Sequence, residues 1–378
     1  MTNSIVVDLT AHISSRSPQP VRHPRDISAI RHRLVIAAGA DSYAVAARLD
    51  VGRHALVLLG ATESKNLRRL RQTYPELPIL IDRAPYNDAD ATAEAPFPVG
   101  NPETALLAPP SIDDLIAAQV EEGATLAVLA MGYLAPGDPE PLRVAIAKVK
   151  AATRRDAVLL VPADAAWLNA TYIAQFIAIL KTCPVPVAVG FNHQGNALKD
   201  AACLHGFRLL FEQVPDAIAW RVDHNGLGAM AHGAAAAVIG VLPSHRHVSV
   251  RGDVSRSPKD KHPHVWVPEL MLWGKASELR RSHFATTEAP GCTASPCLGK
   301  SPIRFSDSES DIHEGHLHNI EAFLEEHRLM PADRDEAKAW WRTRVRDAVA
   351  SMAAFGVRAQ RPRLKPPADV HNWFKELK

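Results

Sequence analysis

Two cysteines with metal-ligand chemistry stand five positions apart in the stretch GCTASPC, which is rich in glycine, proline and small polar residues. Structural zinc takes four ligands, mostly thiolates and imidazoles, in a tetrahedron. Cys292 and Cys297, with one of His313, His316 or His318 near the start of the next helical pattern, would supply three of them. A spacing of five matches no common zinc pattern, so a pair of buried thiols without a metal stays open as the alternative.

Acidic, amide and imidazole side chains also follow apolar runs at three other places. Asp82 is the last residue of PILID. Asn192 and His193 come directly after VAVGF, and Asp223 and His224 come directly after AIAWRV. Such groups can act as nucleophile, general base or proton donor when they share a pocket. Each also has an ordinary alternative as a turn-capping or loop hydrogen-bonding residue. The elements around them decide whether they meet.

Eight short apolar runs recur between residues 33 and 243, with helical patterns between them. The runs are RLVIAAGA, HALVLLGAT, PILIDRAPY, ATLAVLAMGY, AVLLVPAD, PVPVAVGFNH, AIAWRVDHNG and AAAAVIGVLP. Runs that are apolar on both faces are typical of parallel strands covered by helices. The pattern predicts a (β/α)8 TIM barrel, and the even spacing favours closure over an open doubly wound sheet. In a barrel the candidate residues at the strand ends share the face that carries active sites.

The composition is that of a globular chain and says little about partners. Of 378 residues, 47% are hydrophobic and 22% charged, and the formal net charge is +2, so no overall field indicates a polyanionic partner. The sequence has neither a long uncharged apolar run nor a basic start followed by an apolar core. We therefore expect a cytoplasmic protein with no membrane partner. Four cysteines in so long a chain make no disulfide framework.

The character of the chain changes after the eighth apolar run. Basic residues gather in SHRHVSVRGDVSRSPKDKHPH, and two amphipathic helical patterns follow the cysteine pair. We predict an N-terminal extension (1–29), a barrel (30–250), a zinc-type subdomain with closing helices (251–360) and a C-terminal tail (361–378). A local cluster of basic residues indicates nucleic-acid binding better than the net charge of the whole chain does. His245, Arg246 and Arg251 are therefore candidate nucleic-acid contacts, with a solvated basic loop as the alternative.

The cysteine region resembles the zinc-binding part of the tRNA-guanine transglycosylases, the queuine or archaeosine tRNA-ribosyltransferases. That family has a C-x-C-x-x-C turn followed by a His-Asn-Leu helix start. Cys292 and Cys297 match the first and third cysteines, Ala294 stands at the second, and His318 in HisAsnIle matches the ligand histidine. The resemblance implies a structural zinc with one ligand missing. His316 is the candidate for the fourth position.

Three barrel segments resemble the same family in the same order. VLLGAT resembles its Leu-Gly-Asn-Thr strand, PILIDRAPY its ILTDSGGFQ strand, and GVLPSHRH its CVLPTR segment. The resemblance implies that Asp82 handles the exchanging base as proton donor and acceptor. It also implies backbone contacts near His245 and Arg246.

Other family positions are not matched. Ile239 or Gly240 occupies the place of the nucleophilic aspartate, and the ends of the fourth and fifth runs, AMGYL and VPADA, lack the base-recognising aspartate and glutamine. Asp223 is the predicted replacement for the nucleophile, and Asn192 and His193 are predicted to bind the base. Asp164, which ends the fifth run, is a weaker candidate.

The function expected from this resemblance is exchange of guanine for a 7-deazaguanine base in tRNA or DNA. The divergent zinc turn and strand ends suit the DNA-modifying kind of relative. The alternative is a catalytically degenerate subunit that binds nucleic acid or dimerises, as a homodimer or with an active paralogue. A third hypothesis, a metal-dependent barrel hydrolase, requires two or three of His193, His224 and His232 to converge with a carboxylate on one ion.

Overall fold

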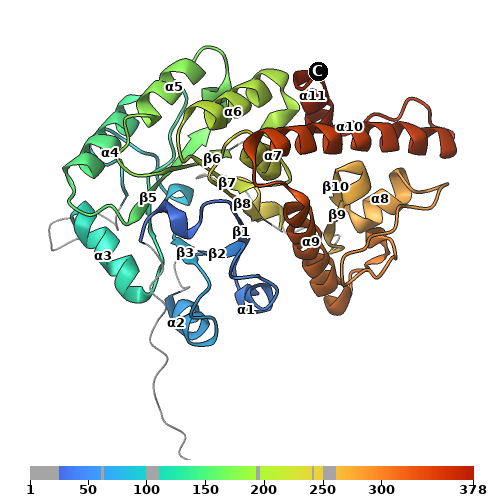
Figure 1. The fold of residues 1–378 in the computed structure, drawn as a ribbon, viewed down its shortest axis with the longest axis horizontal. Helices are drawn as coiled ribbons and strands as arrows, with labels where there is room; N and C mark the ends of the chain where they lie inside the picture. The colour runs from blue at the N-terminus through green and yellow to red at the C-terminus, as the bar shows by residue number, and fades with distance from the viewer. Residues whose placement is uncertain (1–24, 61–63, 99–109, 193–195, 241, 250–260) are drawn as a thin grey trace, which may run out of the picture.

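The eight apolar runs form the eight strands of a nearly closed barrel. The computed structural model describes residues 25–60, 64–98, 110–192, 196–240, 242–249 and 261–378 (Figure 1). The strands are β1 (Arg33–Ala38), β2 (His54–Leu59), β3 (Ile79–Asp82), β4 (Ala127–Ala130), β5 (Ala157–Asp164), β6 (Val187–Asn192), β7 (Ile218–Val222) and β8 (Ala236–Gly240). They are parallel and follow the order β3-β2-β1-β8-β7-β6-β5-β4. The predicted barrel is confirmed.

The outer strands β3 and β4 lie next to each other and bring the sheet close to closure. Thr125, just before β4, donates its backbone N–H to the carbonyl of Ile79, and its hydroxyl accepts the N–H of Ile79. Arg71 donates to the same hydroxyl. These contacts join the two edges at the amino ends of the strands, so the carboxyl ends face a common mouth.

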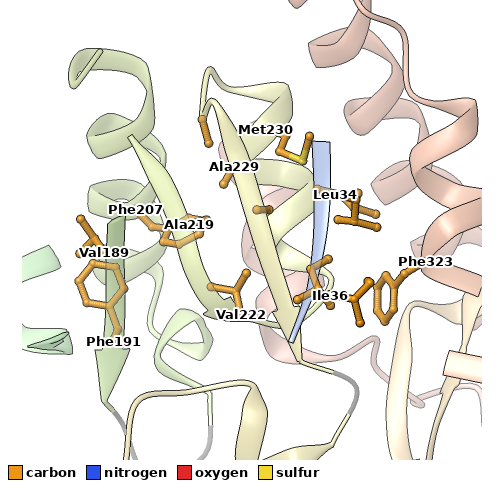
Figure 2. Packing of buried hydrophobic residues seen from close by; sticks show 14 of the residues in the cluster. Leu34, Ile36, Val189, Phe191, Phe207, Ala219, Val222, Ala229, Met230 and Phe323 are labelled. Carbon is orange, nitrogen blue, oxygen red and sulfur yellow. The ribbon is translucent and has the colours of Figure 1, made fainter. Parts of the chain in front are cut away.

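Helices between the strands cover the outside of the barrel. They are α1 (Ser42–Ala46), α2 (Ser64–Thr73), α3 (Ile112–Glu122), α4 (Glu140–Ala151), α5 (Ile173–Leu180), α6 (Ala201–Gln213) and α7 (Asn225–Ala231). Strand residues alternate between this layer and the barrel interior. Figure 2 shows Phe207 of α6 beside Val189 and Phe191 of β6, in the outer layer. Val35, Leu80 and other alternate residues fill the interior.

The chain after β8 forms a hairpin, a cysteine-bearing turn and four helices. The elements are β9 (His264–Val267), β10 (Leu272–Lys275), α8 (Ala276–Ser282), α9 (Glu309–Leu329), α10 (Arg334–Arg358) and α11 (Ala368–Glu376). β9 and β10 are antiparallel. Ser308 and Asp333 cap α9 and α10 by accepting backbone N–H groups. Helix α9 lies against β9 and β1, where Phe323 packs beside Ile36 (Figure 2).

The segment that we predicted as a tail contains a packed helix. Trp373 of α11 is fully buried, stacks on His232 with ring centroids 5.4 Å apart, and donates its indole N–H to the Asn225 side chain. Helix α11 therefore packs the C-terminal part of the chain against α10 and α6 and beside α7. Within the described ranges, every helix is too short or too polar to span a bilayer.

Candidate functional site

The predicted metal ligands Cys292, Cys297 and His318 meet in the segment after the barrel. The Sγ atoms of Cys292 and Cys297 lie 3.6 and 3.2 Å from Nδ1 of His318. Ligand atoms of all three side chains lie within 4.8 Å of one another. Tetrahedral zinc, with bonds of about 2.3 Å to sulfur and 2.0 Å to nitrogen, places such atoms about 3.5 Å apart. The group therefore fits a metal ion of the size and coordination of zinc.

Two contacts to strand β9 aim His318 at the cysteines. Its Nε2 lies 2.6 Å from the carbonyl oxygen of Trp266, which can only accept, so Nε2 carries the proton and Nδ1 presents its lone pair to the sulfurs. The neighbouring Asn319 accepts the N–H of Trp266 and donates to the carbonyl of His264. The His-Asn pair thus fixes helix α9 on β9 and sets the imidazole tautomer that a metal needs.

The four thiols divide into two kinds. The contact with Cys297, and then that with His318, lowers the pKa of Cys292 to about 4. Burial raises the pKa values of Cys183 and Cys203 to about 11, as expected for inert core thiols. The same contact raises the pKa of Cys297, so the cysteine pair shares one thiolate, whereas Cys183 and Cys203 stay neutral thiols.

His316, predicted as the fourth ligand, does not join this group. It lies two positions before His318 on α9, so the two side chains leave the helix on different sides. Burial lowers its pKa, and its charged surroundings include Asp41 and Arg246, on the side toward the barrel. Ala294, at the position of the missing cysteine, donates its backbone N–H to Sγ of Cys292 at 3.4 Å. In the described residues the chain supplies three ligands to this cluster.

Asp82 lies at the carboxyl end of β3, as predicted, and is fully buried. One carboxylate oxygen accepts the N–H of Ala84 at 2.9 Å. The other accepts the Tyr86 hydroxyl at 2.6 Å and the Trp220 indole at 2.9 Å. Burial, followed by the nearby Asp82 charge, raises the pKa of Tyr86 well above its usual value, so the phenol stays a donor. Asp82 is thus held inside the barrel by three hydrogen bonds.

A strained residue on β7 completes this network. Arg221 has a φ of 52°, which is uncommon outside glycine, and it lies where the pairing of β7 with β8 shifts register. Its guanidinium donates to the Tyr86 hydroxyl at 2.9 Å and to the carbonyl of Ser244. The bulge lets Trp220 and Arg221 both reach the Asp82 network from one strand.

Asp164 and Asn192 end neighbouring strands at the same mouth. They are partners in the pairing of β5 with β6, and their alternation with the interior residues Leu160 and Ala188 places them on the inner face. Asp164 accepts the hydroxyl of Tyr133, from the loop after β4, at 2.6 Å. His193 lies outside the described residues. The mouth of the barrel thus carries Asp82 and Asp164, with tyrosine hydroxyls on both.

Asp223 does not share this environment with Asp82. It lines a separate cavity of about 380 Å³ between the ends of β6 and β7, the β9–β10 hairpin and the start of α11. Arg221, Arg246 and Asp369 line the same cavity, and Asp82 does not. No hydrogen bond or ion pair joins Asp82 to Asp223 among the described residues, and Arg221 contacts the Asp82 network while it also lines the cavity.

The predicted nucleic-acid contacts lie close to this cavity and are partly buried. The Arg246 guanidinium stacks over Trp273 with its carbon 3.3 Å from the ring centroid, and it donates to the carbonyl of Gly240. Burial lowers the pKa of Arg246 to about 9, which leaves it cationic at neutral pH. Burial also lowers the pKa of His245 to about 4, so it is neutral. Arg251 lies outside the described residues.

Sequence reasoning missed Asp369. Its carboxylate accepts the side-chain amides of Asn196 at 2.7 Å and Asn225 at 3.0 Å, and it lies beside His224. The helical pattern of ADVHNWFKE after two prolines was the available signal for α11. Nothing in the sequence indicated which surface that helix would meet.

The comparisons with known proteins add little beyond the architecture. No protein-family model and no curated protein matches the chain. Chains of known structure match it, among them the crystal structure of a putative phosphonomutase from Burkholderia cenocepacia J2315. That match covers 57% of this chain and 90% of that chain, with 16% identity and a TM-score of 0.34. A likeness at this level carries no argument about activity.

Proposed function

We propose that this protein exchanges a guanine for a 7-deazaguanine base in tRNA or DNA, in the manner of the tRNA-guanine transglycosylases. The observation that carries the proposal is the grouping of Cys292, Cys297 and His318 in the segment after the eighth strand. The resemblance to the transglycosylases implies the same three ligands. The proposed ion is zinc, because two thiolates and one imidazole suit it best.

The proposed role of the zinc is structural. When bound, it ties the turn that carries the cysteines to helix α9, because the three ligands come from these two segments. The residues themselves already fix the histidine tautomer through the carbonyl of Trp266. The metal cluster lies in the subdomain and not among the barrel-mouth residues, so no chemical step requires it.

The proposed chemistry takes place at the barrel mouth. Breaking the bond between a base and its sugar needs an acid for the departing base and a carboxylate that attacks or shields the sugar carbon. Asp82, between Tyr86 and Trp220, is the proposed group on the base side. Asp164 shares the mouth with it and is the better candidate for the sugar side, because Asp223 lines the separate cavity. The partner would be a nucleic acid bound across this face.

A catalytically silent subunit that binds nucleic acid or dimerises is the second candidate. The specific observation in its favour is that both oxygens of Asp82 are engaged within the fold and the residue is fully buried. In addition, Ile239 faces the helical layer and Gly240 lies against the backbone of His245, so β8 offers no carboxylate to the mouth. Such a chain would act with an active partner.

The test is incorporation of labelled guanine or 7-cyano-7-deazaguanine into bulk tRNA and into duplex DNA. We expect label in one polymer, reduced at least about a hundredfold by Asp82→Asn and by Asp164→Asn, because each removes a charged group from the reaction. Asp223→Asn should retain activity. Glu140→Gln, an exposed carboxylate on α4, is the matched control. No incorporation by folded wild-type protein would favour the silent subunit instead.

A further inference from the structure

A second group of metal-ligand side chains lies at the wall of the cavity, away from the cysteines. Asp223 and His224 connect β7 to α7, and Asp369 lies in the first turn of α11. One ligand atom from each of the three lies within 4.8 Å of the others. Elements that are far apart in the chain thus bring two carboxylates and one imidazole to one point.

The imidazole of His224 is buried between these carboxylates. Its Nε2 lies 3.4 Å from Oδ2 of Asp369 and its Nδ1 lies 3.6 Å from Oδ1 of Asp223. Only 2% of His224 is exposed, and neither ring nitrogen has a hydrogen-bond partner in the described part of the chain. Trp266 stacks on the ring with centroids 4.7 Å apart and holds it in place.

A neutral imidazole alone does not suit this position. It has one N–H and one lone pair, so one of its nitrogens would direct a lone pair at a carboxylate. Hydrogen bonds from N–H to oxygen measure about 2.7–3.2 Å, shorter than either separation here. Two atoms that share one ion at about 2.0–2.2 Å lie about 3 to 3.6 Å apart. A cation bound to one of the two nitrogens removes the conflict, because the other nitrogen then carries the N–H.

The negative charge of the two carboxylates also favours a bound cation. Asn225 donates its amide to both, at 2.6 Å to Asp223 and 3.0 Å to Asp369. Asn196 donates a further amide to Asp369 at 2.7 Å. Amide groups satisfy hydrogen bonds but bring no net charge, and buried carboxylates need a charged partner. Arg246 offsets part of the Asp223 charge, and Asp369 lies deeper, with 4% of its side chain exposed.

We propose that Asp223, His224 and Asp369 bind a divalent cation whose remaining positions open to the cavity. Two carboxylates with one imidazole suit Mn²⁺, Fe²⁺ or Zn²⁺, whereas the thiolate cluster suits zinc. The cavity of about 380 Å³ next to the three residues has room for water or a ligand group on the ion. The chain then carries two metal sites of different chemistry, joined through Trp266, whose carbonyl contacts His318 and whose ring contacts His224.

The test is a titration of purified full-length protein with Mn²⁺, in which electron paramagnetic resonance counts the free ion. Mn²⁺ favours oxygen and imidazole ligands over thiolates, so it reports on this site. We expect one Mn²⁺ per chain. Asp369→Asn and His224→Gln should each weaken binding at least about tenfold, as loss of one ligand does. Glu376→Gln, which changes another carboxylate on the same helix α11, should bind as wild type does.

Folding is checked separately so that a weak result has a clear meaning. Circular dichroism and the thermal midpoint of each variant establish that α11 is still docked, and the partly exposed Asp223→Asn provides a third, milder loss of ligand. Absence of Mn²⁺ and Zn²⁺ binding beyond the ion held by the cysteines would overturn the proposal, as would folded variants that bind like wild type. Since the titration contains no nucleic acid, it succeeds or fails independently of base exchange.

Discussion

The two clusters of metal-ligand residues differ in how the chain brings them together. Cys292, Cys297 and His318 lie within 27 consecutive positions of one subdomain, and their geometry depends on one turn, one helix and strand β9. The other cluster joins the end of β7 to a helix that starts 146 positions later. Local clusters of soft ligands are visible as sequence patterns, while a cluster closed by a distant helix is not.

The difference has a physical consequence for stability. An ion in the thiolate cluster would tie the cysteine turn to helix α9, so we expect metal binding there to be coupled to folding. The carboxylate cluster instead rests on packing that exists without an ion, because Trp373, Trp266 and Asn225 already hold the elements together.

The largest effect is expected from Cys297→Ser. Loss of a thiolate ligand should release the bound zinc and destabilise the chain by about 5 kcal/mol or more, because the binding free energy of a structural zinc is folding free energy. Metal analysis and urea denaturation measure both quantities. Cys183→Ser removes a thiol outside the cluster and is the control. Equal stability of the two variants would mean that the cysteine cluster is a pair of buried thiols only.

Trp373→Ala should undock helix α11. The indole is fully buried, donates to Asn225 at 2.7 Å and meets Trp341 edge-on with centroids 5.6 Å apart. Truncation of such a side chain costs about 3–5 kcal/mol. We expect this variant to lose Mn²⁺ binding and keep its zinc. Denaturation together with metal analysis checks this, and loss of both metals at once would show that the two clusters are one cooperative unit.

Acid should weaken the contact between the far end of α9 and the barrel. Burial lowers the pKa of His54 to about 4 and that of His327 to about 3, and the two rings lie 5.6 Å apart. Below the unfolded pKa of about 6.5, the unfolded chain binds protons that the folded chain excludes. Stability is therefore complete above that pH and falls by about 1.4 kcal/mol per pH unit for each histidine down to its folded pKa.

His327→Phe should reduce the acid slope between pH 6.5 and pH 4 by about 1.4 kcal/mol per pH unit, which is the share of one histidine, while His54 and His245 keep theirs. Urea denaturation at several pH values measures the slope, and His313→Gln, on an exposed position of the same helix, is the control. An unchanged slope for His327→Phe would place the acid-sensitive groups elsewhere.

The smallest effect is expected from Asn196→Ala, which removes the amide that bonds Asp369 at 2.7 Å. Loss of a hydrogen bond to a charged group costs about 1–2 kcal/mol. The variant should also bind Mn²⁺ more weakly, because Asp369 is less well oriented. Asn372→Ala removes a bond between α11 and the backbone of Leu198 and Lys199 without touching a carboxylate, and it should leave Mn²⁺ affinity unchanged.

The strand pattern by itself determined the barrel. Each strand is covered on both faces, so it must be apolar at every position, and eight evenly spaced apolar runs have few other ways to be buried. The cysteine pair and His318 could likewise be predicted as metal ligands, because cysteine and histidine are zinc-ligand residue types and these three lie in a short segment. Asp82 at the end of β3 followed from the strand boundary.

Tertiary structure decided which carboxylates share a site. Asp82 and Asp223 both end strands on one face, yet the register shift at Arg221 sends the end of β7 toward a separate cavity. His316 and His318 differ by two positions, and only the docking of α9 on β9 decided which faces the thiols. Asp369 depends on where α11 packs. Side-chain burial and helix docking arise from contacts between distant segments. The residue types of one segment do not indicate which distant segment it will contact.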